Sequence, residues 1–509
     1  MTELVLAIDA GTTGVRSMFF DKSGSVIASA YSEFESIFPH PSWVEQRADS
    51  WWEKSCETIQ RCLKEGKISP EHVIAISVTN QRETVVPIDE NGVPLRNAIV
   101  WQDRRTVKQC NWIEETIPQV QVYTISGLRV DPYFTAPKIL WIRENEREVY
   151  DKTHKFLLVH DYLIYRLSEE TITDYSNASR TLLFDIRTAK WSDKLLEALE
   201  VANEKLPRLV ESGTLVGELT SSAANETGLK AGTPIVAGGG DQQCAALGVG
   251  VVREGMIKCT TGTGTFLLSH SNTVKLDPSM RVLCSRHVVP NAFVVEASMF
   301  TTGSALKWYR DNLGSEEIGL ADERGVDPYD IITEAAEKSP PGAEGVIHIP
   351  HFVGAGAPNW NPHARGIFAG LALGHSRHHL IRAILEGVSY EIRTNVDVMR
   401  ELGLSIQEVR VTGGASRSET WMQIQADVLR TPVIRSKLEE ATAIGAAILA
   451  FKGINVFKSV VDAAEEMVQT LDPLDPRAET LDVYQRGYST FKKLYAAISD
   501  IQWTENYFP

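Results

Sequence analysis

The feature of this sequence that most constrains its fold is a short turn, rich in glycine and threonine, that occurs once in each half of the chain. Around the first turn the residues read as three strands over 4–9, 15–21 and 26–34, joined by turns at 10–14 and 22–25. Around the second turn, the apolar runs MIKCTT and TFLLSHS flank Gly262-Thr-Gly264 within 256–271. Two hairpins of one design, far apart in one chain, predict a duplicated domain.

The length of the chain also favours two domains. A single hydrophobic core rarely grows past about 250–300 residues, and this chain has 509. Mixed strand and helix patterns predict an α/β fold, with strands over 73–79, 234–237 and 408–412, and helices over 135–146, 195–201, 378–402, 420–429 and 441–451. We expect the boundary near 245–255, which divides the chain into 1–248 and 249–509.

Charge and cysteine content narrow the class of protein. The net charge of −15 argues against a nucleic-acid partner, because such proteins usually present a basic face. The six cysteines form no CxxC pair, which favours a reducing, cytoplasmic location. No apolar run reaches the length of about 18 residues that would predict membrane insertion, and the start MTELVLAIDAG reads as a first strand, not a signal peptide. The sequence leaves homo-oligomer formation open.

Phosphate recognition is expected at the two turns, because the GxxxxGK[ST] and GxGxxG motifs are missing from the sequence. In Gly11-Thr12-Thr13-Gly14, glycines let backbone N–H groups face an anion, and the threonines add hydroxyl donors. Arg16 adds a positive charge, and Asp9 is placed to hold Mg²⁺. Thr261-Gly-Thr263-Gly264 repeats this design. Either turn alone reads more simply as a polar hairpin turn, but the pair favours a triphosphate clamp.

Asp241 is the candidate general base. It follows Gly238-Gly239-Gly240, where a buried strand is expected to become a helix. The commonest role of an aspartate at such a junction is to cap the helix. A carboxylate beside Mg-phosphate is also what a kinase needs to orient and deprotonate a hydroxyl group.

A polar loop after strand 73–79 is the candidate substrate site. Arg82 and Glu83 offer a donor fork and an acceptor in one loop, which suits two adjacent hydroxyls. The alternative is a surface ion pair, which contributes little energy. From their position alone, Trp101 and Tyr133 read as ordinary core aromatics, as most such residues are.

At these residues the sequence resembles the FGGY carbohydrate kinases over nearly its whole length. The matching segments are IDAGTTGVRS, PSWVEQ, VTNQRETVV, NAIVWQDRRT, SGLRVDPYF, TDYSNASRTLLFDI, GDQQCAALG and TGTGTF. The resemblance implies two actin/hexokinase-like (ribonuclease H-like) α/β domains around a deep cleft. Residues 1–248 would be the FGGY N-terminal domain with the polyol and phosphate site, and 249–509 the C-terminal domain with the nucleotide site.

The resemblance also implies roles for individual residues. Asp241 would be catalytic, and the polyol contacts would be Arg82, Glu83, Trp101, Tyr133, Asp241, Gln242 and Phe266. The ATP contacts would be Thr12, Thr13, Gly14, Arg16, Thr263, Gly303, Lys307, Gly414 and Ser418. Asp9 and Asp241 would lie at Mg²⁺.

Within the family, the N-terminal half is most similar to members that phosphorylate glycerol. We therefore expect transfer of the ATP γ-phosphate to a terminal hydroxyl of glycerol. Thr261, Lys307 and Ser418 stand where those members usually carry Tyr, Gln and Asn, so erythritol, xylitol or xylulose stays open as the substrate. A non-catalytic ATP switch or sugar sensor is a further alternative, although a pure nucleotide switch has no use for the polyol contacts.

Overall fold

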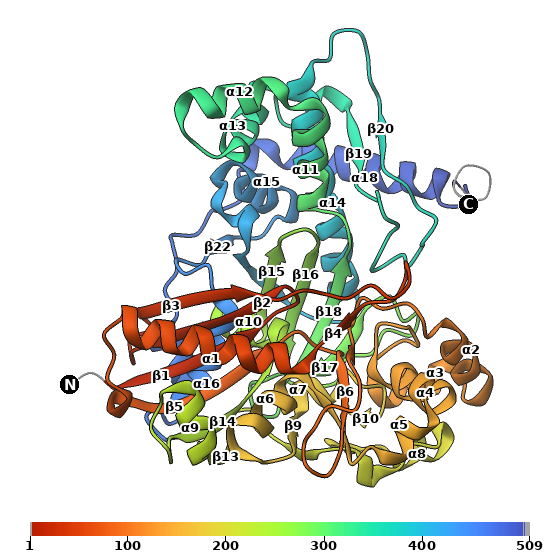
Figure 1. Cartoon of the computed structure of the whole chain (residues 1–509). Coiled ribbons are helices and arrows are strands. Elements are labelled where there is room, and N and C mark those ends of the chain that lie inside the picture. The colour runs from red at the N-terminus through yellow and green to blue at the C-terminus, as the bar shows by residue number, and fades with distance from the viewer. Residues whose placement is uncertain (1–2, 502, 504–509) are drawn as a thin grey trace.

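The N-terminal half is built on a six-stranded sheet. The computed structural model describes residues 3–501 and 503, and its first sheet has the order β13-β14-β5-β1-β2-β3 (Figure 1). The strands are β1 (Leu4–Ala10), β2 (Gly14–Phe20), β3 (Val26–Glu33), β5 (Val73–Asn80), β13 (Leu215–Glu218) and β14 (Pro234–Gly240). β1, β2 and β3 form an antiparallel meander, whereas β5 runs parallel to β1 and β14 parallel to β5.

The second half repeats this design in a sheet of order β17-β18-β16-β15-β21-β22. Its strands are β15 (Gly255–Thr261), β16 (Thr265–Ser271), β17 (Leu283–Arg286), β18 (Phe293–Met299), β21 (Ile406–Thr412) and β22 (Val433–Arg435). Here β15 pairs antiparallel with β16 and parallel with β21, as β1 does with β2 and β5. The prediction of two α/β domains with matching hairpins is confirmed.

Helices cover both sheets, and shorter strands form small separate sheets. In the N-terminal half they are α1 (Ala48–Glu65), α2 (Val107–Thr116), α3 (Gln119–Ser126), α4 (Thr135–Asn145), α5 (Arg147–Lys152), α6 (Val159–Ser168), α7 (Tyr175–Ala178), α8 (Asp193–Leu199), α9 (Ser221–Thr227) and α10 (Asp241–Gly248). The short strands are β4 (Glu45–Gln46), β6 (Val85–Ile88), β7 (Ala98–Ile99), β8 (Lys155–Leu158), β9 (Ile172–Asp174), β10 (Phe184–Asp185), β11 (Lys190–Trp191) and β12 (Arg208–Val210).

The C-terminal half adds two short strands and the remaining helices. They are α11 (Gly303–Leu313), α12 (Ser315–Arg324), α13 (Pro328–Ala335), β19 (Ile347–Ile349), β20 (Ile367–Ala369), α14 (Arg377–Glu401), α15 (Glu419–Leu429), α16 (Ala441–Gly453), α17 (Val460–Met467) and α18 (Leu481–Ile498). No helix within 3–501 is long and apolar enough to cross a membrane.

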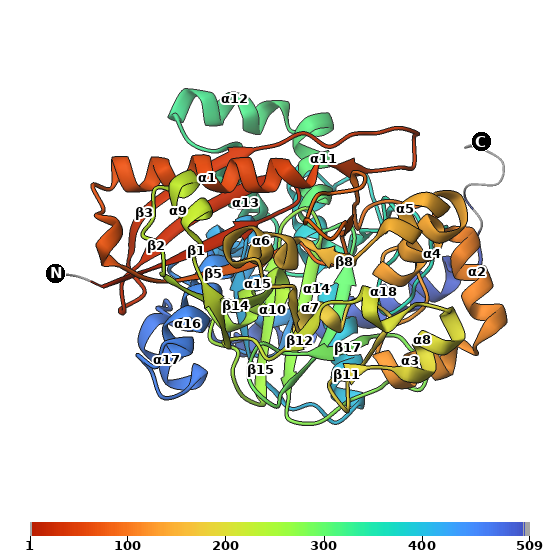
Figure 2. The ribbon, with the colours of Figure 1, turned by 60° about the horizontal axis from the view of Figure 1, so that its bottom comes forward.

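Helix α16 belongs by sequence to the second half but packs on the sheet of the first. Figure 2 shows α1 on one face of this sheet and α16 with α17 on the other. Its sequence ATAIGAAILAF is apolar on nearly all sides, which is typical of a helix buried all round. A Cβ on Gly445 would lie 2.0 Å from the Cys244 carbonyl oxygen, so glycine lets α16 approach α10 closely. The C-terminal half therefore completes the N-terminal core, and a domain boundary at 248/249 stays a prediction.

The predicted elements match the observed ones to within two residues, with one exception. The sequence predicted that the strand 234–237 would end before the glycines, but β14 continues through Gly238 to Gly240. A Cβ on Gly238 would lie 1.9 Å from the Val78 carbonyl oxygen of β5. The glycines therefore allow close strand packing, and Gly240, not Asp241, occupies the cap position of α10.

Candidate active site

Three parallel strands of the first sheet place the predicted catalytic groups at one edge. β1, β5 and β14 run side by side, and Asp9 and Gly239 both pair with Thr79 of β5. Asp9 lies at the carboxyl end of β1, Arg82 just after β5, and Asp241 just after β14. Ligand sites of open α/β sheets form at the carboxyl ends of parallel strands. The sheet thus brings together side chains from three distant segments.

The first turn is held in place by side chains from other elements. A Cβ on Gly14 would lie 2.5 Å from the Ser32 carbonyl oxygen, so a larger residue does not fit. The Thr13 hydroxyl lies 3.0 Å from the Tyr31 hydroxyl, and Trp101 Nε1 donates to Thr12 Oγ1 at 3.0 Å. The structure therefore joins the predicted phosphate turn to one of the predicted polyol contacts.

Asp9 lies among other carboxylates. Burial, followed by the negative charges of Asp241 and Glu440, raises the pKa of Asp9 to about 7, and Arg16 opposes this shift. Arg16 itself forms an ion pair with Glu440 at 3.1 Å, and Glu440 comes just before α16 in the second half of the chain. Neighbouring carboxylates repel one another when they are charged, and a cation offsets this repulsion.

The site fits Mg²⁺ better than a metal that needs a full protein cage. No group of three or more His, Cys, Asp or Glu side chains arranged to hold a metal ion occurs among residues 3–501 and 503. Mg²⁺ is usually held by one or two carboxylates together with water and substrate phosphates. Asp9 and Asp241 interact electrostatically, and their role as such a pair stays a prediction.

The second turn lies at the carboxyl ends of β15 and β21. The Thr263 carbonyl accepts hydrogen bonds from the backbone N–H groups of Thr302 and Ser304, both at 3.1 Å. A Cβ on Gly303, the first residue of α11, would lie 2.1 Å from the Gly262 carbonyl oxygen. A Cβ on Gly414 would meet no atom within 4 Å, so this residue faces open space. The structure brings Thr263, Gly303 and the loop at Gly414 to one end of the second sheet.

The other two predicted nucleotide contacts have local partners. The Ser418 hydroxyl accepts a hydrogen bond from Trp421 N at 3.2 Å and so caps α15. Lys307 is exposed on α11 and pairs with Asp311. A role for either residue in nucleotide binding stays a prediction.

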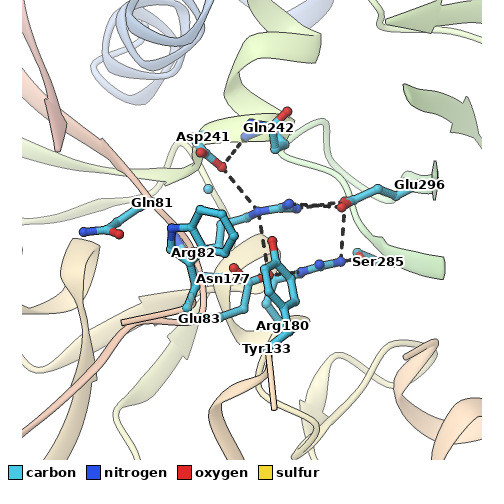
Figure 3. Close-up of polar contacts among 12 residues, drawn as sticks. Gln81, Arg82, Glu83, Tyr133, Asn177, Arg180, Asp241, Gln242, Ser285 and Glu296 are labelled. Carbon is cyan, nitrogen blue, oxygen red and sulfur yellow. Dashed lines mark hydrogen bonds and ion pairs between the residues drawn. The ribbon is translucent and has the colours of Figure 1, made fainter. Parts of the chain in front are cut away.

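Arg82 lies in a buried cluster of charges (Figure 3). Its terminal nitrogens donate to the two carboxylate oxygens of Glu296 at 2.8 Å and 3.0 Å. Its Nε lies 3.3 Å from Asp241 Oδ1 but 3.9 Å from Glu83 Oε1. Arg180 supplies a second guanidinium, with Nε 2.6 Å from Glu83 Oε1. The reading of Arg82 and Glu83 as a surface ion pair is therefore wrong, since both are buried and pair mainly with other residues.

Glu83 has an unusual backbone conformation. Its φ is +64°, in the left-handed region that non-glycine residues rarely adopt. Its carbonyl oxygen accepts hydrogen bonds from Thr135 Oγ1 at 3.2 Å and Lys138 Nζ at 3.3 Å, both on α4. Lys138 is fully buried, and burial lowers its pKa to about 7. Strained backbone held by buried side chains is characteristic of functional sites.

Asp241 and Gln242 begin helix α10. The Asp241 side chain is 29% exposed, and its Oδ1 accepts a hydrogen bond from Gln242 N at 2.7 Å. The Gln242 side chain in turn accepts a hydrogen bond from Lys258 Nζ at 2.7 Å. The carboxylate thus combines a fixed position beside Arg82 with access to solvent, as a general base requires.

Aromatic rings lie beside these polar groups. Trp101 and Tyr133 are half-buried and contact each other edge to face, with ring centroids 5.5 Å apart. Phe266, on β16, is also half-buried and packs against an apolar cluster that includes Ala245 and Ala246 of α10. These three rings are more exposed than typical core aromatics, and two of them lie together, as a sugar-binding surface would need.

Sequence reasoning missed four buried charged residues of the site. They are Lys138, Arg180, Lys258 and Glu296. A signal was present, because Lys258 in GMIKCTT and Glu296 in FVVEASM interrupt apolar strands. Charged residues are rarely buried unless they are paired, so each of these positions implies a partner.

Comparison with known proteins identifies the family. Residues 4–248 match the N-terminal domain of the FGGY family of carbohydrate kinases, and residues 257–454 match its C-terminal domain. The chain therefore belongs to this family, and it is a phosphotransferase by class. It is 37% identical over 484 residues to a glycerol kinase of Thermococcus onnurineus, covering 93% of this chain and 94% of that protein. It is also 37% identical over 503 residues to glycerol kinase 2 of Thermotoga maritima, covering 96% and 97%.

Solved structures with this fold include kinases named for two different substrates. Xylulose kinase from Rhodospirillum rubrum superposes with a TM-score of 0.90 at 28% identity, covering 98% of this chain and 99% of that one. Plasmodium falciparum glycerol kinase with ADP superposes with a TM-score of 0.88 at 26% identity, with the same coverage. The fold is thus shared by kinases for a triol and for a ketopentose.

Proposed function

We propose that this protein transfers the γ-phosphate of ATP to a terminal hydroxyl of glycerol, giving glycerol 3-phosphate. The observation that carries the proposal is the 37% identity to glycerol kinases over more than nine-tenths of the chain. The geometry supports it, because Asp241, Arg82 and Glu83 lie together with Tyr133 (Figure 3). The ring of Trp101 contacts that of Tyr133.

In this proposal Asp241 accepts the proton of the reacting hydroxyl. Arg82 fixes the Asp241 carboxylate through Nε at 3.3 Å, and 29% exposure leaves the carboxylate accessible to substrate. Glu83, Gln242 and the rings of Trp101, Tyr133 and Phe266 form the rest of the polyol site. A polar site that pairs substrate hydroxyls discriminates strongly against analogues that lack them.

The phosphates of ATP bind to the two turns. Thr12, Thr13, Gly14 and Arg16 receive the transferring phosphate, while Thr263, Gly303, Lys307, Gly414 and Ser418 contact the rest of the nucleotide. Asp9 and Asp241 would hold Mg²⁺, which would supply positive charge to neutralise the phosphates during phosphoryl transfer. Arg16 then exchanges its ion pair with Glu440 for a phosphate oxygen.

A substrate panel tests the proposal directly. ADP release is measured with Mg-ATP and glycerol, erythritol, xylitol or xylulose as acceptor. We expect the highest kcat/KM for glycerol. Higher kcat/KM with xylulose would favour the second candidate, a ketopentose kinase, which the similarity to the Rhodospirillum rubrum enzyme supports. No ADP release with any acceptor would refute the kinase activity itself.

We also propose a cytoplasmic location, a small polyol and Mg-ATP as the small-molecule partners, and no nucleic-acid partner. Among the described residues all cysteines are free, and all but Cys56 are buried. This pattern is typical of proteins kept in a reducing compartment. The net charge of −15 supports the absence of a nucleic-acid partner, because such proteins usually present a basic face. Assembly into a homo-oligomer is compatible with these features.

A further inference from the structure

Lys258 is a fully buried lysine that the proposed mechanism does not use. It lies in the middle of β15, where it pairs in register with Leu268 of β16, and Leu268 pairs with Glu296 of β18. Its charge interacts favourably with Asp241 and Glu296, and burial lowers its pKa to about 7. Burying an ammonium group is expensive unless it is paired and hydrogen-bonded. The position of this lysine therefore calls for a specific role.

The contact between Lys258 and Gln242 fixes the orientation of a side-chain amide. Lys258 Nζ lies 2.7 Å from the Gln242 side-chain oxygen and 3.5 Å from its backbone carbonyl oxygen. The oxygen and nitrogen of a glutamine side chain are ordinarily hard to tell apart. In its protonated form Lys258 has hydrogen-bond donors only, so the amide atom beside it must then be the oxygen. The NH₂ group of Gln242 then forms the other branch of the amide.

The free branch of this amide is a hydrogen-bond donor beside the candidate base. In the described part of the chain no acceptor is recorded for Gln242 Nε2, and the residue is only half-buried. Asp241, which precedes Gln242 in the chain, is a carboxylate that accepts hydrogen bonds, and Glu83 is a second carboxylate of the proposed polyol site. A donor here complements them, because each hydroxyl of a polyol can both donate and accept.

We propose that Lys258 is a positioning residue, which holds the Gln242 amide so that its NH₂ group donates to a hydroxyl oxygen of the polyol. The inference rests on the proposed function, and it assigns to a buried lysine of the second domain a part in polyol recognition. Lys258 does not itself touch the substrate. It acts only through Gln242.

Glycerol analogues that lack one hydroxyl test this role. 1,2-Propanediol lacks a terminal hydroxyl and 1,3-propanediol lacks the central one, and both are measured as competitive inhibitors against glycerol. Lys258→Met is expected to raise the KM for glycerol roughly 3- to 10-fold, the range for one neutral hydrogen bond. Lys258→Met should leave the inhibition constant of one of the two analogues unchanged, because that analogue lacks the hydroxyl to which the Gln242 NH₂ group donates. An equal loss for glycerol and both analogues would overturn the proposal.

A double-mutant cycle tests whether Lys258 acts through Gln242. Gln242→Ala removes the amide, so Lys258→Met should add no further loss in that background. Independent, multiplying losses would overturn the proposal, since coupling is the property that a cycle measures. Arg410→Met is the matched control. Arg410 pairs in register with Lys258 on the neighbouring strand, but its side chain binds Glu408 and the Val249 carbonyl. The KM of Arg410→Met for glycerol should therefore stay at the wild-type value.

Gln242→Glu keeps the inference testable if Lys258→Met does not fold. The new carboxylate keeps a partner for Lys258 but replaces the NH₂ donor by an acceptor. We expect the same selective loss of affinity for glycerol, and a wild-type KM would overturn the proposal. Wild-type protein is assayed first. Absence of turnover with glycerol would refute the proposed function, whereas turnover with unchanged variants refutes only the role of Lys258.

Discussion

The carboxylate of Glu296 on β18 accepts hydrogen bonds from both terminal nitrogens of Arg82, at 2.8 Å and 3.0 Å. This contact joins the two halves of the chain inside the candidate site. The two arginines beside it hold the pKa of Glu296 at about 2, against the opposing effect of burial. The same guanidinium places its Nε 3.3 Å from Asp241 Oδ1. Glu296 therefore anchors the arginine that lies beside the candidate base.

Glu296→Gln should cost both stability and activity. It leaves Arg82 and Arg180 buried with too little negative charge, and breaking a buried ion pair typically costs about 3–5 kcal/mol. We expect a large fall in the thermal midpoint and a fall in kcat/KM for glycerol. Glu408→Gln, which breaks the partly exposed pair with Arg410, is the control and should change neither by much. A wild-type midpoint for Glu296→Gln would show that the cluster does not depend on this charge.

Gly414→Ala should weaken ATP binding without destabilising the fold. A Cβ on Gly414 meets no protein atom, and its φ is not in the left-handed region. If ATP occupies the open space at Gly414, the added methyl collides with the nucleotide. We expect at least about a tenfold rise in the KM for ATP, with an unchanged KM for glycerol and an unchanged thermal midpoint.

Gly319→Ala is the matched control for this variant. Gly319 lies on α12, and a Cβ there also meets no atom. The KM of Gly319→Ala for ATP should equal that of the wild type. An unchanged KM in Gly414→Ala as well would place the nucleotide elsewhere.

Lys138 should make stability depend on pH. Its pKa is about 7 in the folded protein and 10.5 in its ordinary state, and the first cause of the difference is burial. Between these values the unfolded chain binds more protons, so the free energy of unfolding rises with pH, by up to about 1.4 kcal/mol per pH unit. Below pH 7 both states carry the proton and the contribution is constant.

Thermal midpoints of wild type and Lys138→Met, measured from pH 6 to 9.5, isolate this effect. The difference in midpoint, wild type minus variant, should be flat below pH 7 and should grow above it. A difference that does not vary with pH would mean that Lys138 keeps its charge when buried. The variant should also raise the KM for glycerol, because Lys138 supports the Glu83 carbonyl.

The architecture could be predicted because it depends on local patterns. Apolar strands and the turns at Gly11–Gly14 and Gly262–Gly264 are readable from neighbouring residues, and their repetition predicted two sheets. The strand through Gly238–Gly240 was predicted too short, because glycine usually ends strands. Glycine is needed in this strand because the Val78 carbonyl of β5 approaches it closely. No local sequence pattern reveals this contact.

The partners of the buried charges could not be predicted from local sequence. Arg82 and Glu83 are neighbours in the chain, yet Arg82 pairs with Glu296 and Glu83 with Arg180. These pairs form because β18, which carries Glu296, and the loop after α7, which carries Arg180, pack against the loop after β5. The sequence could indicate that Glu296 needs a partner, and only the fold identifies it.

Asp241→Asn separates catalysis from structure. Gly240 occupies the cap position of α10, and the Asp241 carboxylate is partly exposed beside Arg82. Asparagine keeps the shape and the acceptor oxygen but cannot take up a proton at neutral pH. General base catalysis contributes about 10²–10⁴-fold, so we expect kcat to fall by at least about 100-fold, while ATP binding and the thermal midpoint change little.

A true capping aspartate provides the control for this variant. The Asp327 side chain accepts a hydrogen bond from Tyr329 N at 2.9 Å and caps α13. Asparagine caps about as well as aspartate, so Asp327→Asn should keep both kcat and the thermal midpoint. If Asp241→Asn behaved in the same way and retained more than about a tenth of the wild-type kcat, Asp241 would not be the base. Asp9, which interacts electrostatically with Asp241, would then be a further carboxylate to test.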